Sequence, residues 1–125
     1  MALGETELVA LRTWLVAITI FELPNFWQYL VSPTGRLDGF FSTLHNGRAE
    51  KRAWSIVLAL LCLARIHAVV YHQSEGALAH NAAVHVLEAV TFGYEFLVKR
   101  SNGNWTVFSV ILANAFWFTS AALRV

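Results

Sequence analysis

Charged residues are scarce in this chain. Only 14% of its 125 residues are Asp, Glu, Lys or Arg, against about 25% in an average soluble domain. A protein of this size has a large surface for its volume and needs many polar side chains to cover it. Hydrophobic residues instead make up 57% of the chain, and its mean hydropathy is +0.52. The sequence therefore predicts an integral membrane protein with a single domain, residues 1–125.

The small number of cysteines, the low net charge and the absence of known catalytic motifs exclude several other classes of protein. Cys62 is the one cysteine, which excludes a disulfide scaffold and a multi-cysteine zinc site. The formal net charge is only +1, without a basic stripe, so nucleic acid is not an expected partner. The sequence has no phosphate-binding glycine loop, no HExxH and no GxSxG, and it predicts neither an enzyme nor a soluble small-molecule substrate.

Short polar segments divide the chain into four apolar stretches. They cover residues 8–31, 53–71, 77–98 and 105–123. A helix needs about 20 residues to cross the hydrocarbon core, with a range of about 17–25, and all four stretches fit. The expected fold class is therefore all-α, an integral membrane bundle of four transmembrane helices. A soluble four-helix bundle is the competing interpretation, but it would need a polar outer face that these stretches lack.

The first stretch leaves two arrangements open. It contains Arg12, Glu22 and Pro24, so it could form an interfacial helix followed by a re-entrant one. Neighbouring helices can compensate for the donor that a proline lacks, and we expect a single kinked span.

The connections predict the topology. Residues 72–76 are short enough to force an antiparallel hairpin, while residues 32–52 and 99–104 carry most of the basic side chains. The positive-inside rule places these two loops in the cytoplasm or mitochondrial matrix, with both termini on the other side. Beyond ordinary anchoring, five basic residues are candidates for lipid headgroup contacts: Arg48, Lys51, Arg52, Lys99 and Arg100.

Ionisable residues inside the apolar stretches form a candidate buried set. Charged side chains are costly in a bilayer and usually face the bundle interior in pairs. At 100° per residue, Asn81, His85, Glu88, Phe92 and Glu95 fall within an arc of about 80° on one helix. We expect Arg65 to pair with Glu88, Glu95 or Glu22 and so to fix helix packing. The predicted ion-pair and packing set is Arg65, Glu22, Glu88, Glu95 and His85.

A proton path or a metal site is the functional alternative for the same residues. Di-iron bundle sites repeat Glu-x-x-His on two helices, whereas here His85-x-x-Glu88 has the reverse order and occurs once. Stable metal sites need three or more converging ligands, and the five histidines are dispersed. The sequence predicts no metal and no organic cofactor, and bound lipids such as cardiolipin as the non-protein groups.

Four short patterns occur in the order and spacing of one known family. They are Leu11-Arg12-x-Trp14-Leu15-Val16; Asn46-Gly47-Arg48-Ala49 with Arg52 and Trp54; Arg65-Ile66-x-Ala68; and Phe92-x-x-Glu95 followed by Lys99-x-Ser101. Between residues 11 and 101 the chain thus resembles the ergosterol biosynthesis protein 28 family of small four-helix membrane proteins. It departs from the family at Thr91, where a histidine is usual, and at Lys99, where an aromatic residue is usual.

The resemblance implies a non-catalytic scaffold that tethers sterol C-4 demethylation enzymes at the endoplasmic reticulum membrane. Because fold does not fix function, an accessory subunit of a large complex is the alternative, in the respiratory chain or ATP synthase of the mitochondrial inner membrane. A third hypothesis, an enzyme or proton carrier, would use His85, Glu88 and Glu95. The first two hypotheses predict the same partners, other integral membrane proteins and membrane lipids.

Overall fold

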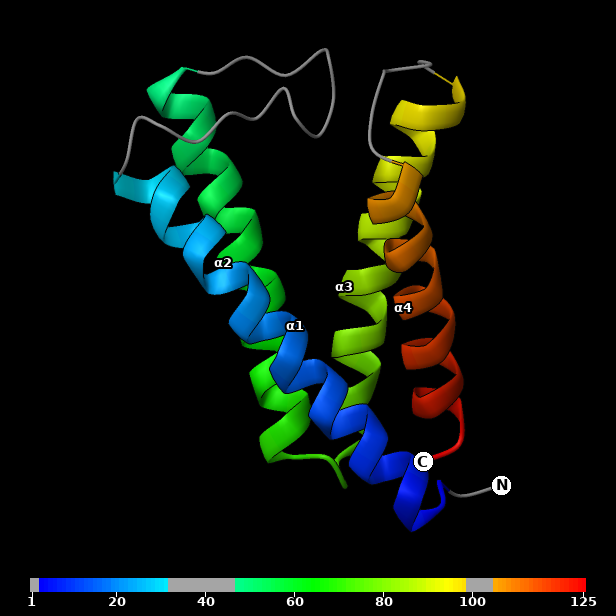
Figure 1. Cartoon of the computed structure of the whole chain (residues 1–125). Helices are drawn as coiled ribbons and strands as arrows, with labels where there is room; N and C mark the ends of the chain where they lie inside the picture. The colour runs from blue at the N-terminus through cyan, green and yellow to red at the C-terminus, as the bar shows by residue number, and fades with distance from the viewer. Residues whose placement is uncertain (1–2, 32–46, 99–104) are drawn as a thin grey trace.

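The computed structural model describes residues 3–31, 47–98 and 105–125, and the secondary structure of these residues is helical. The elements are α1 (Glu5–Val31), α2 (Arg48–Val70), α3 (Glu75–Gly93), the π-helical turn η2 (Tyr94–Val98) and α4 (Trp105–Leu123). The prediction of an all-α chain with four helices is confirmed (Figure 1). Of the long loop predicted at residues 32–52, residues 32–46 lie outside the described residues, as does the loop predicted at residues 99–104. Residues 48–52 are not a loop but the first residues of α2, because their side chains are compatible with a helix that extends beyond its apolar part.

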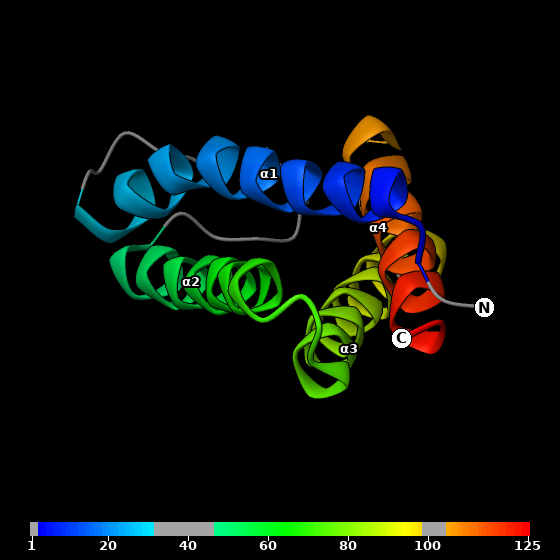
Figure 2. The same cartoon turned by 90° about the horizontal axis from the view of Figure 1, so that it is seen from below.

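The helices form two antiparallel hairpins. Helix α1 packs along α2, α3 packs along α4, and the contact between α2 and α3 joins the hairpins. In Figure 1 the two hairpins meet at the lower end, where both termini lie, and they diverge toward the upper end. Figure 2, seen from below, shows α1 beside α2 and its N-terminal part reaching α4.

Helix α1 is continuous through Pro24, so the two-piece alternative is not what the chain adopts. Glu5 and Glu7 lie in its first turn, where carboxylates interact favourably with the helix dipole. Pro24 itself is exposed on the outside of the helix.

A tight turn joins the two hairpins. The amide of Tyr71 donates to the carbonyl of His67 at 2.9 Å and ends α2, and the amide of Ser74 donates to the Tyr71 carbonyl at 2.8 Å. The Ser74 hydroxyl then accepts the amide of Ala77 at 3.3 Å, which is an N-cap for α3. These local bonds reverse the chain within a few residues.

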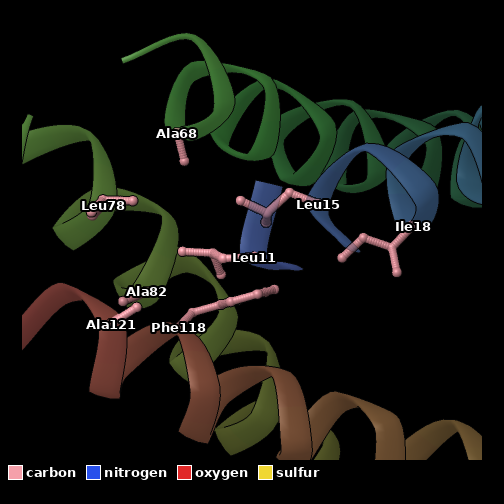
Figure 3. Packing of buried hydrophobic residues seen from close by; sticks show 8 residues of the cluster. All are labelled: Leu11, Leu15, Ile18, Ala68, Leu78, Ala82, Phe118 and Ala121. Atoms are coloured by element: carbon pink, nitrogen blue, oxygen red, sulfur yellow. The ribbon is translucent and has the colours of Figure 1, made fainter. Parts of the chain in front are cut away.

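An apolar cluster lies where the hairpins meet. Leu11 and Leu15 of α1 and Phe118 of α4 are each 1% exposed, and they point toward one another in Figure 3. Small side chains at this level allow close helix approach. The remaining buried members of the cluster are Ile18, Ala68, Leu78, Ala82 and Ala121.

Only α2 and α4 pass a test of length and composition for a membrane span among the described helices. Helices α1 and α3 do not pass, although the sequence predicted four spans. The physical reason is their polar content, which includes Glu22 and Arg12 in α1 and His85 and Glu88 in α3. By this criterion two helices are able to cross a membrane, which is weak support for a membrane location.

Candidate functional site

Arg65 is the centre of a buried polar network. It is 1% exposed on α2, and its Nη1 lies 2.8 Å from Oε2 of Glu22 on α1. Its Nη2 also donates to Oε1 of Glu22 at 3.3 Å, so the guanidinium meets the carboxylate with two nitrogens. The pair thus combines one hydrogen bond, from Nη2, with one close contact of opposite charges, from Nη1.

His85 of α3 extends the network to the second hairpin. Nε of Arg65 donates to Nε2 of His85 at 3.0 Å. An arginine has no acceptor, so Nε2 must be unprotonated and the proton of the neutral ring is on Nδ1. Nδ1 lies 2.7 Å from the carbonyl oxygen of Asn81, to which it donates. The edge-on ring of Phe118, 4.6 Å away between centroids, packs against this ring.

The network joins three helices at fixed distances. A guanidinium stays charged in proteins, so it must have a partner wherever it is buried. Breaking such a pair from one side typically costs about 3–5 kcal/mol, because a charge is then left without compensation. The arrangement therefore fixes which faces of α1, α2 and α3 meet.

The predicted partners of Arg65 have different positions in the structure. Glu22 makes the ion pair, whereas half-buried Glu88 lies near the pair and makes no hydrogen bond or salt bridge within the described part of the chain. Glu95 lies on η2, beyond the end of α3 at Gly93. The regular 100° spacing that predicted a common stripe ends there, because a π-helix bonds i to i+5.

A cavity lies between the two hairpins beside the network. Its volume is about 290 Å³, and we call it the central cavity. Its polar lining includes Glu22, Arg65, Glu88 and Asn114. Its apolar lining includes Ile18, Leu58, Phe92 and Ile111, so all four helices contribute to the wall.

Two further polar contacts within the described residues join α1 to α4 and to the residue that follows it, and neither was predicted from the sequence. Nε1 of Trp14 donates to Oδ1 of Asn114 at 2.7 Å. Arg124 forms a paired ion contact with Glu7, in which Nη1 lies 2.8 Å from Oε2. The single amide side chain in residues 105–123 was a signal for the first contact. Nothing local marked the second, because its partners are far apart in sequence.

The Glu7–Arg124 contact changes the acidity of both groups. The hydrogen bond from Arg124 holds the pKa of Glu7 below its ordinary value of 4.5. The same bond raises the pKa of Arg124. Both shifts favour the charged pair at neutral pH.

The five basic residues predicted to contact lipid headgroups differ in their exposure. Arg48 and Arg52 are exposed at the start of α2, and Nε of Arg52 donates to the carbonyl of Arg48 at 3.3 Å. Lys51, although predicted to contact headgroups, is only 7% exposed. Lys99 and Arg100 lie outside the described residues.

No group of three or more His, Cys, Asp or Glu side chains converges among residues 3–31, 47–98 and 105–125. The rings of His67 and His80 lie edge to face with their centroids 6.4 Å apart. Cys62 is buried in α2. No protein-family model, no curated protein and no solved structure matches this chain.

Proposed function

We propose that this chain is an integral membrane protein whose four helices all cross the bilayer and that it acts as a non-catalytic scaffold for other membrane proteins. The observation that carries the proposal is the apolar outer face of every helix. Large side chains point outward on each one: Ile20 of α1 is 62% exposed, Leu63 of α2 62%, Leu87 of α3 67% and Phe116 of α4 78%. Apolar surface this extensive is typical of contact with lipid or protein.

The polar residues that lower the hydropathy of α1 and α3 are compatible with spanning. Asn81 and His85 of α3 are buried, and Glu22 of α1 is paired with Arg65. Intramembrane polar residues usually face the bundle interior in this way. With the five residues of η2 added to its 19, α3 also has the length for a span.

The scaffold role rests on the resemblance together with the character of the buried network. Arg65 and His85 are held by their neighbours in one arrangement, which suits a rigid structural element. In the ergosterol biosynthesis protein 28 family the corresponding role is to tether sterol C-4 demethylation enzymes at the endoplasmic reticulum. We assign the same class of role to this chain.

A second candidate is an accessory subunit of a large complex in the mitochondrial inner membrane. The exposed Arg48 and Arg52 favour it, because they lie together at one end of α2. Basic residues at a membrane surface attract anionic lipid headgroups, among them cardiolipin.

Purification in mild detergent tests these two roles. A tagged chain should elute with sterol-modifying enzymes if the first role is right, and with stoichiometric oxidative-phosphorylation subunits if the second is right. The same purification from cells that make the untagged chain is the control. A chain that elutes alone and turns over a substrate by itself would contradict both.

A further inference from the structure

The central cavity contains more carboxyl groups than cations. Helix α1 contributes Glu22, α2 contributes Arg65 and α3 contributes Glu88. His85, also on α3, is neutral because its Nε2 accepts from Arg65. Helix α4 contributes Asn114 and has no ionisable residue in Trp105–Leu123. One carboxyl group therefore lacks a matching positive charge.

Glu88 is that carboxyl group. Both terminal nitrogens of Arg65 are directed to Glu22, and its Nε is directed to His85. Within the described residues no hydrogen bond or salt bridge reaches Glu88. A polar group facing apolar walls is stabilised when a donor reaches it, and a carboxylate most of all when the donor is charged.

The rest of the wall suits an apolar body with a cationic end. Leu58 and Ile111 supply aliphatic surface, and the rings of Trp54 and Phe92 line the cavity with centroids 6.3 Å apart. Aromatic rings attract ammonium groups through their π faces. The volume of about 290 Å³ is at the lower end of ligand pockets, which span about 300–1,000 Å³, so the ligand must be small.

We propose that the central cavity binds a small hydrophobic amine, with its ammonium group at Glu88 and its apolar body against Leu58, Phe92 and Ile111. The ammonium supplies the positive charge that the cavity lacks. Amine binding in the central cavity does not depend on the scaffold role. It can be tested whichever partners are found with the purified chain.

The test compares three probes with the same chain and different head groups: decylamine, decanol and decanoate. Dissociation constants are measured by calorimetry on the purified chain in lipid nanodiscs, with empty nanodiscs subtracted. Decylamine should bind about tenfold or more tightly than decanol, since hydrogen bonds to charged groups contribute about 1.5–3 kcal/mol. Decanoate should bind least.

Glu88→Gln separates the charge from the shape of the cavity. It should weaken decylamine about tenfold and leave decanol within about twofold, and the unchanged decanol affinity reports an intact cavity. Glu75→Gln, an exposed carboxyl of the same helix, should leave all three affinities unchanged. Three results would overturn the proposal. The first is equal affinity for decylamine and decanol, which is expected if Glu88 is protonated. The second is a decylamine affinity that Glu88→Gln does not change, and the third is the absence of saturable binding.

Discussion

The two hairpins are held together differently at the level of the termini and midway along the bundle. Near the termini the contact is an apolar cluster around Leu11 and Phe118, with polar bonds at its margins. Midway it is the network of Arg65, Glu22 and His85. Apolar contacts are non-directional, whereas hydrogen bonds have a narrow range of distance and angle. The apolar end therefore supplies most of the attraction, and the polar middle sets the register of the helices.

The largest expected effect comes from removing Glu22 alone. Glu22→Leu leaves the Arg65 side chain, 2% exposed, with a charge that it cannot lose. We expect a loss of about 3–5 kcal/mol in the free energy of unfolding, measured by denaturant titration in detergent.

Arg65→Leu should be milder, because the Glu22 side chain is 21% exposed whereas the Arg65 side chain is 2% exposed. The double change Glu22→Leu with Arg65→Leu should restore most of the loss, since apolar replacement of a buried pair is often close to neutral. A double variant as unstable as Glu22→Leu would contradict the assignment of the pair.

Shortening a side chain in the apolar cluster should have the next largest effect. Leu78 is 3% exposed on α3, and Leu78→Ala should cost about 2–5 kcal/mol because it leaves a cavity. Leu87 lies on the same helix and is 67% exposed, so Leu87→Ala is the matched control. Equal losses for the two variants in the same unfolding assay would show that the packing differs from the one described.

The hydrogen bond between Trp14 and Asn114 should contribute less. Trp14→Phe keeps an aromatic ring and removes the Nε1 donor. A loss of about 1 kcal/mol is expected, the usual net contribution of one hydrogen bond. Asn114→Ala combined with Trp14→Phe should add little to the single change, and full additivity would mean that the two side chains do not interact.

The smallest effect should come from Glu7, and it should depend on pH. Because its pKa is lowered in the folded protein, its contribution is fully present above the ordinary value of 4.5 and is lost as the pH falls below it. Thermal unfolding should therefore separate Glu7→Gln from the unchanged chain at pH 7 and not at low pH. A difference that grows on acidification would reverse the assigned sign.

Hydrophobic run lengths predicted the helices well, because the bounds of a long apolar helix are visible in its composition. The predicted stretch at residues 105–123 and α4 coincide, whereas α1 begins three residues and α2 five residues before the predicted start. The short connection at residues 72–76 likewise predicted the turn, where Ser74 supplies a local cap.

The partner of Arg65 within the site was harder to predict from the sequence. The sequence offered three carboxylates for Arg65, and helical spacing alone could not rank Glu22 of another helix against Glu88 and Glu95. The π-helical turn after Gly93 also ended the spacing that had grouped Glu95 with His85. Contacts such as Glu7 with Arg124 depend on tertiary packing, which no local pattern encodes.

Cysteine accessibility tests the central claim, that four apolar faces lie in lipid around a polar interior. In a Cys62→Ala background, single cysteines replace Ile20, Leu63, Leu87 and Phe116, one outward residue per helix, each 62–78% exposed. Arg48→Cys, at the exposed start of α2, is the control. We predict that a membrane-impermeant maleimide labels position 48 from one side of sealed vesicles and labels none of the four mid-helix positions from either side. Ready labelling of the four positions would place these faces in water and contradict the account.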